Sequence, residues 1–320
     1  MTTTLPDNIR QVFDRFVTTE YTTINRDGQP ITWPVIPYHD PAKGTIDITT
    51  GLGYPKKARD AQGNSRVSLL FSDPTGSGLS EPPAVLVQGT AEVDDRNLDR
   101  NRKRYREQSL EKLPGTKGLY PPEFIQRHME WYFTRIYVYV RPERVLVWPG
   151  GDAGAEPELL DSHMEEVRSA HDQEPVLEPA ALDPSPPAWD ERIGELGSRY
   201  PTAVVSIVGA DGFPLSARVP VTLDRQRKLV RLAQEPAGIP LVEGRACVCA
   251  HKHHPDFKWQ LNFQARGNLV RDGEGWALAP TKLVGGFELP PSRIAVIRDN
   301  ASKAMRYRKV AKREMERLGS

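Results

Sequence analysis

The sequence carries one pattern of strands and turns twice. A β-type segment at 21–25 runs into the turn 27–30, Asp-Gly-Gln-Pro, and a segment at 204–208 runs into the turn 211–214, Asp-Gly-Phe-Pro. The two turns are 211 − 27 = 184 residues apart. Later segments correspond as well: 45–50 with 228–233, 66–71 with 245–250, and 87–93 with 265–270. Apolar segments between such turns are typical of antiparallel strands. The repeat therefore predicts two copies of one mostly β unit.

The composition changes between the two copies. Residues 151–190 are rich in Pro, Glu and Asp, which is typical of an extended linker. We therefore expect a first unit at 1–150 and a second at 191–320. Helical spacing of Ile9, Val12, Phe13 and Phe16 predicts a helix over 8–18. The charged segments 95–113 and 300–318 predict two more helices, the last of them basic.

The charge balance excludes some classes of partner. The chain has 320 residues and a formal net charge of +1, with 38% hydrophobic and 27% charged residues. This composition is typical of a globular protein and gives no general electrostatic case for nucleic-acid binding. No apolar run reaches the roughly 18–20 residues of a membrane-spanning helix. The first residues do not show the pattern of a secretory signal. We expect a cytoplasmic protein without nucleic-acid or membrane partners.

Two cysteines and two histidines alternate on one predicted strand: Cys247, Cys249, His251 and His253. Residues on the same face of a strand lie about 6.6 Å apart, whereas ligand bonds to zinc are about 2.1–2.3 Å long. We therefore expect buried, reduced cysteines and no metal site. An alternative is that the histidines, with His254 beside them, line a cofactor or substrate cavity.

The most specific chemistry lies where a predicted strand ends in Thr49 and Thr50. A Gly- and Pro-containing turn follows, and Lys56 and Lys57 stand at the start of a short predicted helix. Cations at this end of a helix oppose its dipole. Hydroxyls, backbone N–H groups and ammonium groups together are what a phosphate monoester needs. The stretch therefore predicts a phosphate site, and the alternative is a solvated helix start.

The order of motifs over residues 20–93 resembles the pyridoxamine 5′-phosphate oxidase-like superfamily of FMN-binding split barrels. A hairpin is followed by the Thr-Thr strand, the turn, the Lys-Lys helix, the strand 66–71 (Arg-Val-Ser-Leu-Leu-Phe) and a Val-x-Gly-x-Ala segment. The match is looser to residue 148 and returns, weakened, over about 200–275. The resemblance implies a mainly β (α+β) protein of two tandem six-stranded antiparallel split β-barrels with flanking helices.

The resemblance also implies a set of cofactor-binding residues. Thr49 and Thr50 fall where the family holds the flavin phosphate or ribityl chain. Lys56 and Lys57 fall on the family's phosphate-binding Arg-Lys pair. A flavin-contacting amide corresponds to Asn262 of the second copy. The strand that runs along the isoalloxazine ring contributes Trp33, Pro34, Val35, Ile36 and Tyr38.

The two copies differ at these positions. The second copy has the sequence Leu-Ala-Gln-Glu-Pro over 232–236 in place of the Thr-Thr and Lys-Lys stretch, and Glu235 would repel a phosphate. The first copy has Ala84 where the amide is expected. We therefore expect a pseudo-dimer within one chain, in which both copies contribute to one cofactor site. A homodimer of the chain is a further possibility.

These inferences predict an FMN-binding oxidoreductase that acts on a small-molecule substrate. Trp33 and Tyr38 stand where the oxidase has Arg and Lys, and no Arg-x-His motif follows Trp148. Pyridoxamine phosphate is therefore not the expected substrate. Two alternatives stay open: a deazaflavin-dependent reductase of the same fold, and a non-catalytic flavin- or haem-binding protein. The sequence predicts no catalytic acid or base.

Overall fold

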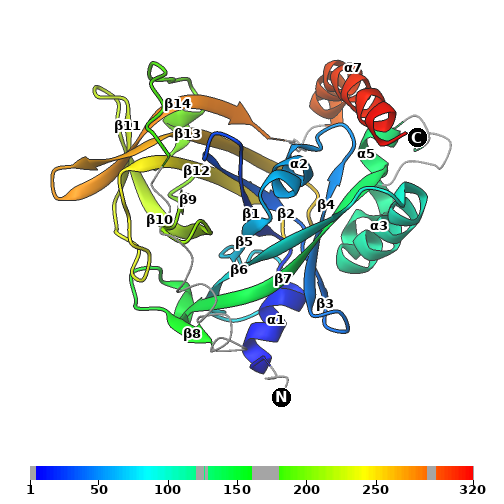
Figure 1. The fold of residues 1–320 in the computed structure, drawn as a ribbon, viewed down its shortest axis with the longest axis horizontal. Coiled ribbons are helices and arrows are strands. Elements are labelled where there is room, and N and C mark those ends of the chain that lie inside the picture. Colours follow the sequence, from blue (N-terminus) through cyan, green and yellow to red (C-terminus); the bar gives the residue numbers. More distant parts are fainter. Residues whose placement is uncertain (1–4, 120–125, 127–128, 161–179, 287–292, 320) are drawn as a thin grey trace.

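Strands are the main regular structure among the described residues and divide into two sheets. The computed structural model describes residues 5–119, 126, 129–160, 180–286 and 293–319. The first sheet has the order β2-β1-β5-β6-β7-β4-β3, with β8 paired to β7, and is drawn from blue to green in Figure 1. Its strands are β1 (Thr19–Ile24), β2 (Pro30–Val35), β3 (Tyr38–Asp40), β4 (Thr45–Gly51), β5 (Arg66–Phe71), β6 (Ala84–Asp94), β7 (Arg135–Trp148) and β8 (Glu158–Leu160).

The second sheet closes into a barrel with the order β10-β11-β14-β13-β12-β9. This is the strand order of the first sheet, with β10 in the place of β2 and β3 together. The register agrees too, because Asp40 pairs with Thr45 and Asp224 pairs with Leu229, each 184 residues on. The strands are β9 (Thr202–Val208), β10 (Pro214–Asp224), β11 (Leu229–Leu232), β12 (Gly244–His253), β13 (Gln260–Asp272) and β14 (Gly275–Gly285).

The prediction of two tandem antiparallel barrels is confirmed, with one difference between them. The second barrel is closed, whereas the first is open because the chain leaves the sheet at Ile36 and Pro37, between β2 and β3. Pro34 and Pro37 lack the N–H that would continue a ladder. This division, together with β8, gives the first sheet eight strands where six were expected.

A glycine at an irregularity in the ladder marks the same place in each barrel. The register shifts between Gln88 and Gly89 in the first and between Arg266 and Gly267 in the second. A Cβ added at either glycine would lie 2.0 Å from a carbonyl oxygen of the facing strand, that of Arg141 or Ala279. Only glycine allows this close approach of two backbones.

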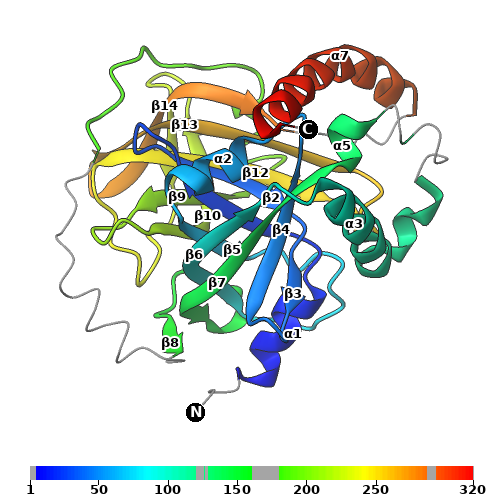
Figure 2. The ribbon, with the colours of Figure 1, turned by 45° about the vertical axis from the view of Figure 1, so that its right-hand side comes forward.

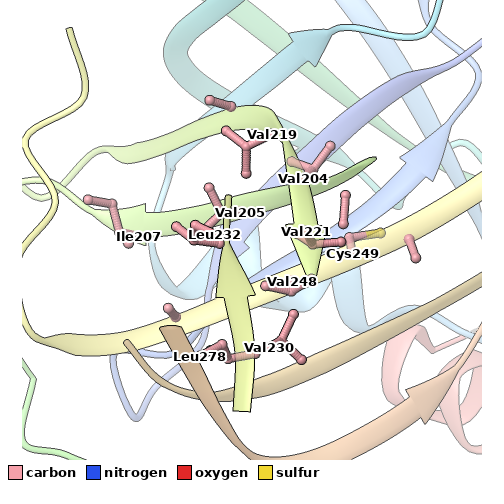
Figure 3. Close-up of a cluster of buried hydrophobic side chains, with 14 of the residues drawn as sticks. Val204, Val205, Ile207, Val219, Val221, Val230, Leu232, Val248, Cys249 and Leu278 are labelled. Carbon is pink, nitrogen blue, oxygen red and sulfur yellow. The ribbon is translucent and has the colours of Figure 1, made fainter. Parts of the chain in front are cut away.

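Aliphatic side chains fill the core of the second barrel. β9 is buried along most of its length, and its Ser206 hydroxyl contacts the first sheet. Because side chains alternate along a strand, Val205 and Ile207 point into the barrel. Figure 3 shows the hydrophobic cluster, which also includes Val204 and Cys249 on the face turned to the first sheet; its labelled members come from β9, β10, β11, β12 and β14: Val204, Val205, Ile207, Val219, Val221, Val230, Leu232, Val248, Cys249 and Leu278.

Four hydroxyl groups connect the two barrels. Thr22 Oγ1 lies 3.2 Å from Ser216 Oγ, and Thr32 Oγ1 donates a 2.7 Å hydrogen bond to Ser206 Oγ. Thr22 corresponds to Ser206, and Thr32 corresponds to Ser216, at the spacing of 184. The two cross-barrel contacts are therefore equivalent, and an approximate two-fold axis relates the barrels at this point.

Helices pack around the first barrel and confirm the predictions at 8–18, 95–113 and 300–318. The last helix, α7, is drawn in red beside α5 in Figures 1 and 2. Tyr307 of α7 stacks on Trp131 of α5 with ring centroids 5.1 Å apart. The α-helices are α1 (Asp7–Arg15), α2 (Lys56–Gly63), α3 (Leu98–Lys112), α5 (Glu130–Phe133) and α7 (Arg293–Leu318), and the 3₁₀ turns are η1 (Pro114–Leu119), η2 (Pro149–Gly151) and η3 (Ile193–Glu195).

None of the described helices has both the length and the apolar character that a membrane span requires. The domain boundaries expected at 150 and 190 stay a prediction, since residues 161–179 of the linker lie outside the described part of the chain.

Candidate functional site

A cavity of about 410 Å³ lies between the two barrels. The first barrel lines it with β2, β4 and the start of α2, the second lines it with β13 and β14, and α7 covers part of it. Its volume is in the range of pockets that bind small molecules. Most of the residues predicted from the sequence lie on its wall: Trp33, Pro34, Val35, Ile36, Thr49, Lys56, Lys57 and Asn262.

Two predicted residues, Thr50 and Tyr38, do not line the cavity. The Thr50 hydroxyl is buried and donates a 2.7 Å hydrogen bond to the carbonyl oxygen of Tyr54. This bond closes the turn that leads from β4 into α2. Tyr38 is buried at the start of β3, where Asp47 of β4 is its ladder partner. Direct contact of either residue with a cofactor stays a prediction.

The two lysines at the start of α2 have different surroundings. Lys56 Nζ lies 2.8 Å from Asp60 Oδ1, one helical turn later, and the Lys56 side chain is 52% exposed. The helix has no acidic residue in its first turn and no side-chain cap on its N-terminal N–H groups. An anion at this position would satisfy N–H groups that the helix itself leaves without partners.

Lys57 lines the cavity and is half-buried. Its ammonium group lies 5.5 Å from the ring centre of Tyr54 and has no hydrogen bond or ion pair within the described residues. Desolvation, with a contribution from Arg135, lowers the pKa of Lys57 to about 8. The folded protein therefore holds this charge at a free-energy cost, which an incoming anion would offset.

Arg135, at the start of β7, is a second buried cation of the first barrel. Its guanidinium donates to the hydroxyls of Tyr54 at 2.9 Å and Tyr105 at 2.7 Å. It also lies 4.0 Å and 4.4 Å from the ring centres of Tyr105 and Tyr132. No carboxylate of the described residues is within 4.0 Å of it. Aromatic rings and hydroxyls thus hold this charge without neutralising it.

The apolar side of the cavity is the edge of the first sheet. β2 is the last strand in its sheet order, so one side of its backbone faces away from the ladder. The Thr32 carbonyl on that side accepts a 3.0 Å hydrogen bond from Gln264 Nε2 of the second barrel. Alternation along an antiparallel strand turns Pro34 the same way. Since proline has no N–H, this position offers the cavity a carbonyl acceptor.

The second barrel closes the cavity with a polar strand and two glycines. Gln260, Asn262 and Arg266 of β13 line it, and the backbone N–H of Gly286 donates to the Asn262 carbonyl at 3.1 Å. A Cβ at Gly286 would lie 1.4 Å from Asn262 Oδ1 and 2.8 Å from the ring of Trp33. Glycine is therefore required for Asn262 and Trp33 to meet across the interface.

The charge of the cavity is of one sign. Every charged side chain that lines it in the described structure is cationic: Lys56, Lys57, Arg135, Arg266 and Arg306. Of these, only Lys56 has a carboxylate within ion-pair distance. A concave site with this charge concentrates anions electrostatically. The lining residues that the structure describes include no histidine and no carboxylate.

The alternating cysteines and histidines lie elsewhere. Cys247 and Cys249 are buried in β12, and Cys249 belongs to the core cluster of the second barrel. His251 and His253 are buried near a separate cavity of about 310 Å³, whose lining includes His251 and Asp73. His251 Nε2 lies 2.5 Å from Glu20 Oε1, and His253 Nε2 lies 3.2 Å from Thr18 Oγ1. These histidines therefore do not line the cationic cavity.

Sequence reasoning missed the arginines of the site. Arg135 follows a long segment between β6 and β7 that has no counterpart in the second copy, so no correspondence pointed to it. Arg266 falls within the repeated segment 265–270, and no role was predicted for it from the sequence. Arg306 and Tyr307 belong to α7, whose contact with the cavity depends on tertiary packing. Only the structure shows that these arginines form no ion pair within the described residues.

Comparisons with known proteins concern the fold. No family model matches the chain, and no curated protein matches it. Among solved structures, the chain is similar to an F420 reductase, with 17% identity, a TM-score of 0.33, and coverage of 44% of this chain and 98% of that one. It is also similar to a pyridoxamine 5′-phosphate oxidase-related, FMN-binding protein from Nostoc punctiforme, with 13% identity, a TM-score of 0.32, and coverage of 45% and 85%. A haem storage protein from Vibrio cholerae matches with 12% identity, a TM-score of 0.33, and coverage of 45% and 94%.

Proposed function

We propose that the cavity binds a phosphorylated flavin, FMN, and that the protein is a flavin-dependent oxidoreductase acting on a small molecule. One observation supports this most directly: a desolvated lysine without an acidic partner, Lys57, stands at an uncapped helix start beside an apolar wall. FMN combines the two features that such a wall would recognise, a phosphate monoester and a planar aromatic ring.

The residues of the cavity divide into two groups under this proposal. Thr49, Lys56 and Lys57, with the first N–H groups of α2, would hold the phosphate. The β2 edge from Trp33 to Ile36, with Asn262 opposite, would hold the ring. When bound, the flavin supplies hydride transfer, and the protein supplies binding, orientation and electrostatics.

The chain's own residues contribute in two ways. Trp33 and Phe257 line the cavity and would cover a bound ring with apolar surface. Lys57 and Arg135 place positive charge on the other side, where a tail phosphate is stabilised. The described lining contains no conventional general base, so a proton in the overall reaction must come from the substrate, the solvent or Lys57.

A deazaflavin is the second candidate cofactor, and the number of cationic side chains in the cavity supports it. Arg135 and Arg306 add positive charge beyond Thr49, Lys56 and Lys57, and a deazaflavin with its longer tail would use that charge. Haem is a weaker candidate, since none of the described lining residues is His, Cys or Met, and only the tyrosines of the lining could serve as axial ligands.

Titration of the purified protein tests the proposal. FMN, riboflavin and a deazaflavin would be added to the full chain, with binding followed by quenching of cofactor fluorescence. We expect one flavin per chain, and FMN bound at least about tenfold more tightly than riboflavin, because a charged hydrogen bond contributes about 1.5–3 kcal/mol. A preference for the deazaflavin would replace FMN by the second candidate.

Two lysine variants show whether the phosphate is held where we propose. Lys57→Gln should reduce the preference for FMN over riboflavin, whereas Lys117→Gln, at an exposed lysine of η1, should leave it unchanged. Equal affinities for FMN and riboflavin in the wild type, or an unchanged preference in Lys57→Gln, would refute the proposed phosphate site.

A further inference from the structure

Arg266 is a buried cation that forms no ion pair within the described residues. It lies in β13 of the second barrel, is 9% exposed, and lines the cavity. Its Nε donates a 2.6 Å hydrogen bond to Gln264 Oε1, and its two terminal nitrogens have no partner within the described residues. Burial lowers the pKa of Arg266 from its ordinary value. Holding an unpaired guanidinium in this way destabilises the folded protein.

The hydrogen bonds around Gln264 fix the direction of the Arg266 side chain. Gln264 donates to the Thr32 carbonyl across the interface at 3.0 Å and accepts from Arg266 Nε. Asn262, Gln264 and Arg266 are two residues apart, so they share the face of β13 that is turned to the first barrel. With Nε engaged, the terminal nitrogens of Arg266 are the donors left to face the cavity.

Arg266 approaches the same end of the cavity as the start of α2. Asp60 of α2 interacts electrostatically with both Lys56 and Arg266, although its hydrogen bond is to Lys56. One carboxylate is therefore within electrostatic range of two cations, one from each barrel. Asp60 forms no ion pair with Arg266 within 4.0 Å, so the guanidinium keeps its capacity to bind a further anion.

The first barrel shows what this strand position does when it has a structural role. Gln88 precedes the irregular glycine of β6 as Arg266 precedes that of β13. Gln88 Nε2 donates a 2.9 Å hydrogen bond to the Pro214 carbonyl, a backbone contact between the barrels. Arg266 forms no such backbone contact in the described structure and turns toward the cavity instead. A glutamine is therefore sufficient for packing at this position.

We propose that Arg266 is a ligand-binding residue contributed by the second barrel, whose terminal nitrogens hold the phosphate group from the side opposite α2. This inference rests on the proposed function and extends it: the phosphate contacts both barrels, so the site is complete only when they are packed together. A guanidinium suits this task because its planar set of donors matches two phosphate oxygens.

Flavin titrations with three variants test this role. Arg266→Gln should weaken FMN binding by about 10- to 100-fold and leave riboflavin binding nearly unchanged, as expected for the loss of a charged hydrogen bond. Arg266→Lys should recover part of the affinity, since it keeps the charge without the planar fork. Arg271→Gln, at an exposed arginine of the same strand, serves as the matched control and should bind both flavins as the wild type does.

Thermal unfolding without flavin separates a binding role from a structural one. If Arg266 is held for a ligand, Arg266→Gln should raise the Tm of the free protein by about 2–4 °C, because it removes an unpaired buried charge. Millimolar pyrophosphate should raise the Tm of the wild type, and the rise should be smaller in Arg266→Gln. A lower Tm in the variant, with an undiminished response to pyrophosphate, would overturn the proposal.

The two measurements distinguish failure of this inference from failure of the proposed function. If the wild type binds no flavin but its pyrophosphate response depends on Arg266, the flavin proposal fails and Arg266 remains an anion-binding residue. If the wild type prefers FMN and Arg266→Gln keeps that preference in full, the proposed function stands and the role of Arg266 is refuted.

Discussion

The two barrels share a strand order but differ where the cavity lies. Residues 214–224 run as one strand and close the second barrel, whereas residues 30–40 are divided into β2 and β3 at Ile36 and Pro37. The cavity is lined by Trp33 to Ile36, the residues just before that division. The comparison teaches that one repeat unit yields a closed structural barrel when its strand is continuous and a ligand-accessible edge when it is interrupted.

The connections between strands also differ, and two of those in the first barrel are longer and contain helices. The first barrel inserts α2 between β4 and β5, and α3, η1 and α5 between β6 and β7. The second joins β13 to β14 through Gly273 and Glu274 alone. Lys56, Lys57 and the tyrosines around Arg135 belong to or adjoin these insertions. The first barrel therefore carries most of the cationic wall, and the second contributes the opposite face.

The largest expected effect concerns a charge that only one barrel has. Glu20 is fully buried in β1, and Val204 occupies the equivalent position of β9. Its Oε1 lies 2.7 Å from Arg218 Nη2 and 2.5 Å from His251 Nε2, both in the second barrel. Glu20→Gln should lower the free energy of unfolding by about 3–5 kcal/mol, because it removes the one carboxylate that is ion-paired with Arg218 in the described structure and leaves only the weaker interaction with Asp73. Urea unfolding measures this.

A matched pair and a pH series sharpen that test. Adding Arg218→Met to Glu20→Gln should recover much of the lost stability. Without recovery, the ion pair would not be the source of that stability.

Burial alone would raise the pKa of Glu20, but Arg218 and His251 lower it below 4.5. Its contribution is therefore complete above pH 4.5 and is lost as the pH falls through the lower folded value. The variant should lack this acid-dependent loss.

The second effect tests the equivalence of the barrels. Gly89→Ala and Gly267→Ala each place a Cβ 2.0 Å from a backbone carbonyl oxygen, which cannot rotate away as a side chain can. We expect each to lower the free energy of unfolding by about 3 kcal/mol, at the upper end of the range for overpacked sites. Gly63→Ala is the control, since no atom would approach its Cβ within 4 Å. Costs that differ greatly between Gly89 and Gly267 would contradict the equivalence.

The third effect tests the difference between the barrels at the phosphate site. Lys57 has a pKa of about 8 in the free protein, and the second barrel has no lysine over 232–236. FMN affinity should therefore fall up to about tenfold per pH unit above pH 8, as Lys57 loses its proton. Lys57→Gln should flatten the profile over that range. A wild-type affinity that does not change between pH 7 and pH 10 would contradict this role of Lys57.

Lys57 should have the opposite influence on the stability of the free protein. Its folded pKa lies below the 10.5 of an ordinary lysine, so its charge is held at a cost below pH 8. The relative stability of the folded state should rise as the pH increases from about 8 toward 10.5. Lys57→Gln should remove this rise, which a comparison of Tm values across that range would detect.

The smallest effect concerns the hydroxyl groups that connect the barrels. Thr32→Val removes the donor to Ser206, and Ser216→Ala removes the equivalent group of the second barrel. Each should lower the free energy of unfolding by about 1 kcal/mol, the net contribution of a typical hydrogen bond. Because the two positions are related by the approximate two-fold axis, similar values are expected. A cost at only one position would show that the hydroxyl contacts are less symmetric in solution.

The repeat could be predicted from the sequence because it is a local signal. Turn residues at 27–30 and 211–214 fix a spacing that later strands follow, so the strand order of one copy predicted that of the other. The opening of the first barrel at Ile36 and Pro37 was not predicted. A proline in an edge strand and a proline where a strand is interrupted look the same in a sequence. Only the hydrogen-bonded pairing in the structure distinguishes the two.

Only part of the candidate site could be predicted, because some of its residues belong to local motifs and others depend on contacts between distant segments. Trp33, Thr49 and Lys57 follow from motif order within one barrel, and the structure places all of them on one wall. Lys56 and Asp60 are four residues apart on a helix, a spacing that favours their ion pair, so the difference between the two lysines was accessible. Arg266 was not, because its significance depends on which carboxylates are absent around it.

The position of the cavity between two barrels of one chain has a consequence for dilute solution. A site shared by separate subunits is lost when they dissociate, and its ligand affinity then varies with protein concentration. Here both walls of the cavity belong to the same polypeptide, so the effective concentration of one barrel near the other does not depend on protein concentration. Under the proposed function, we therefore expect the ligand affinity to be independent of protein concentration, which titrations at several dilutions would measure.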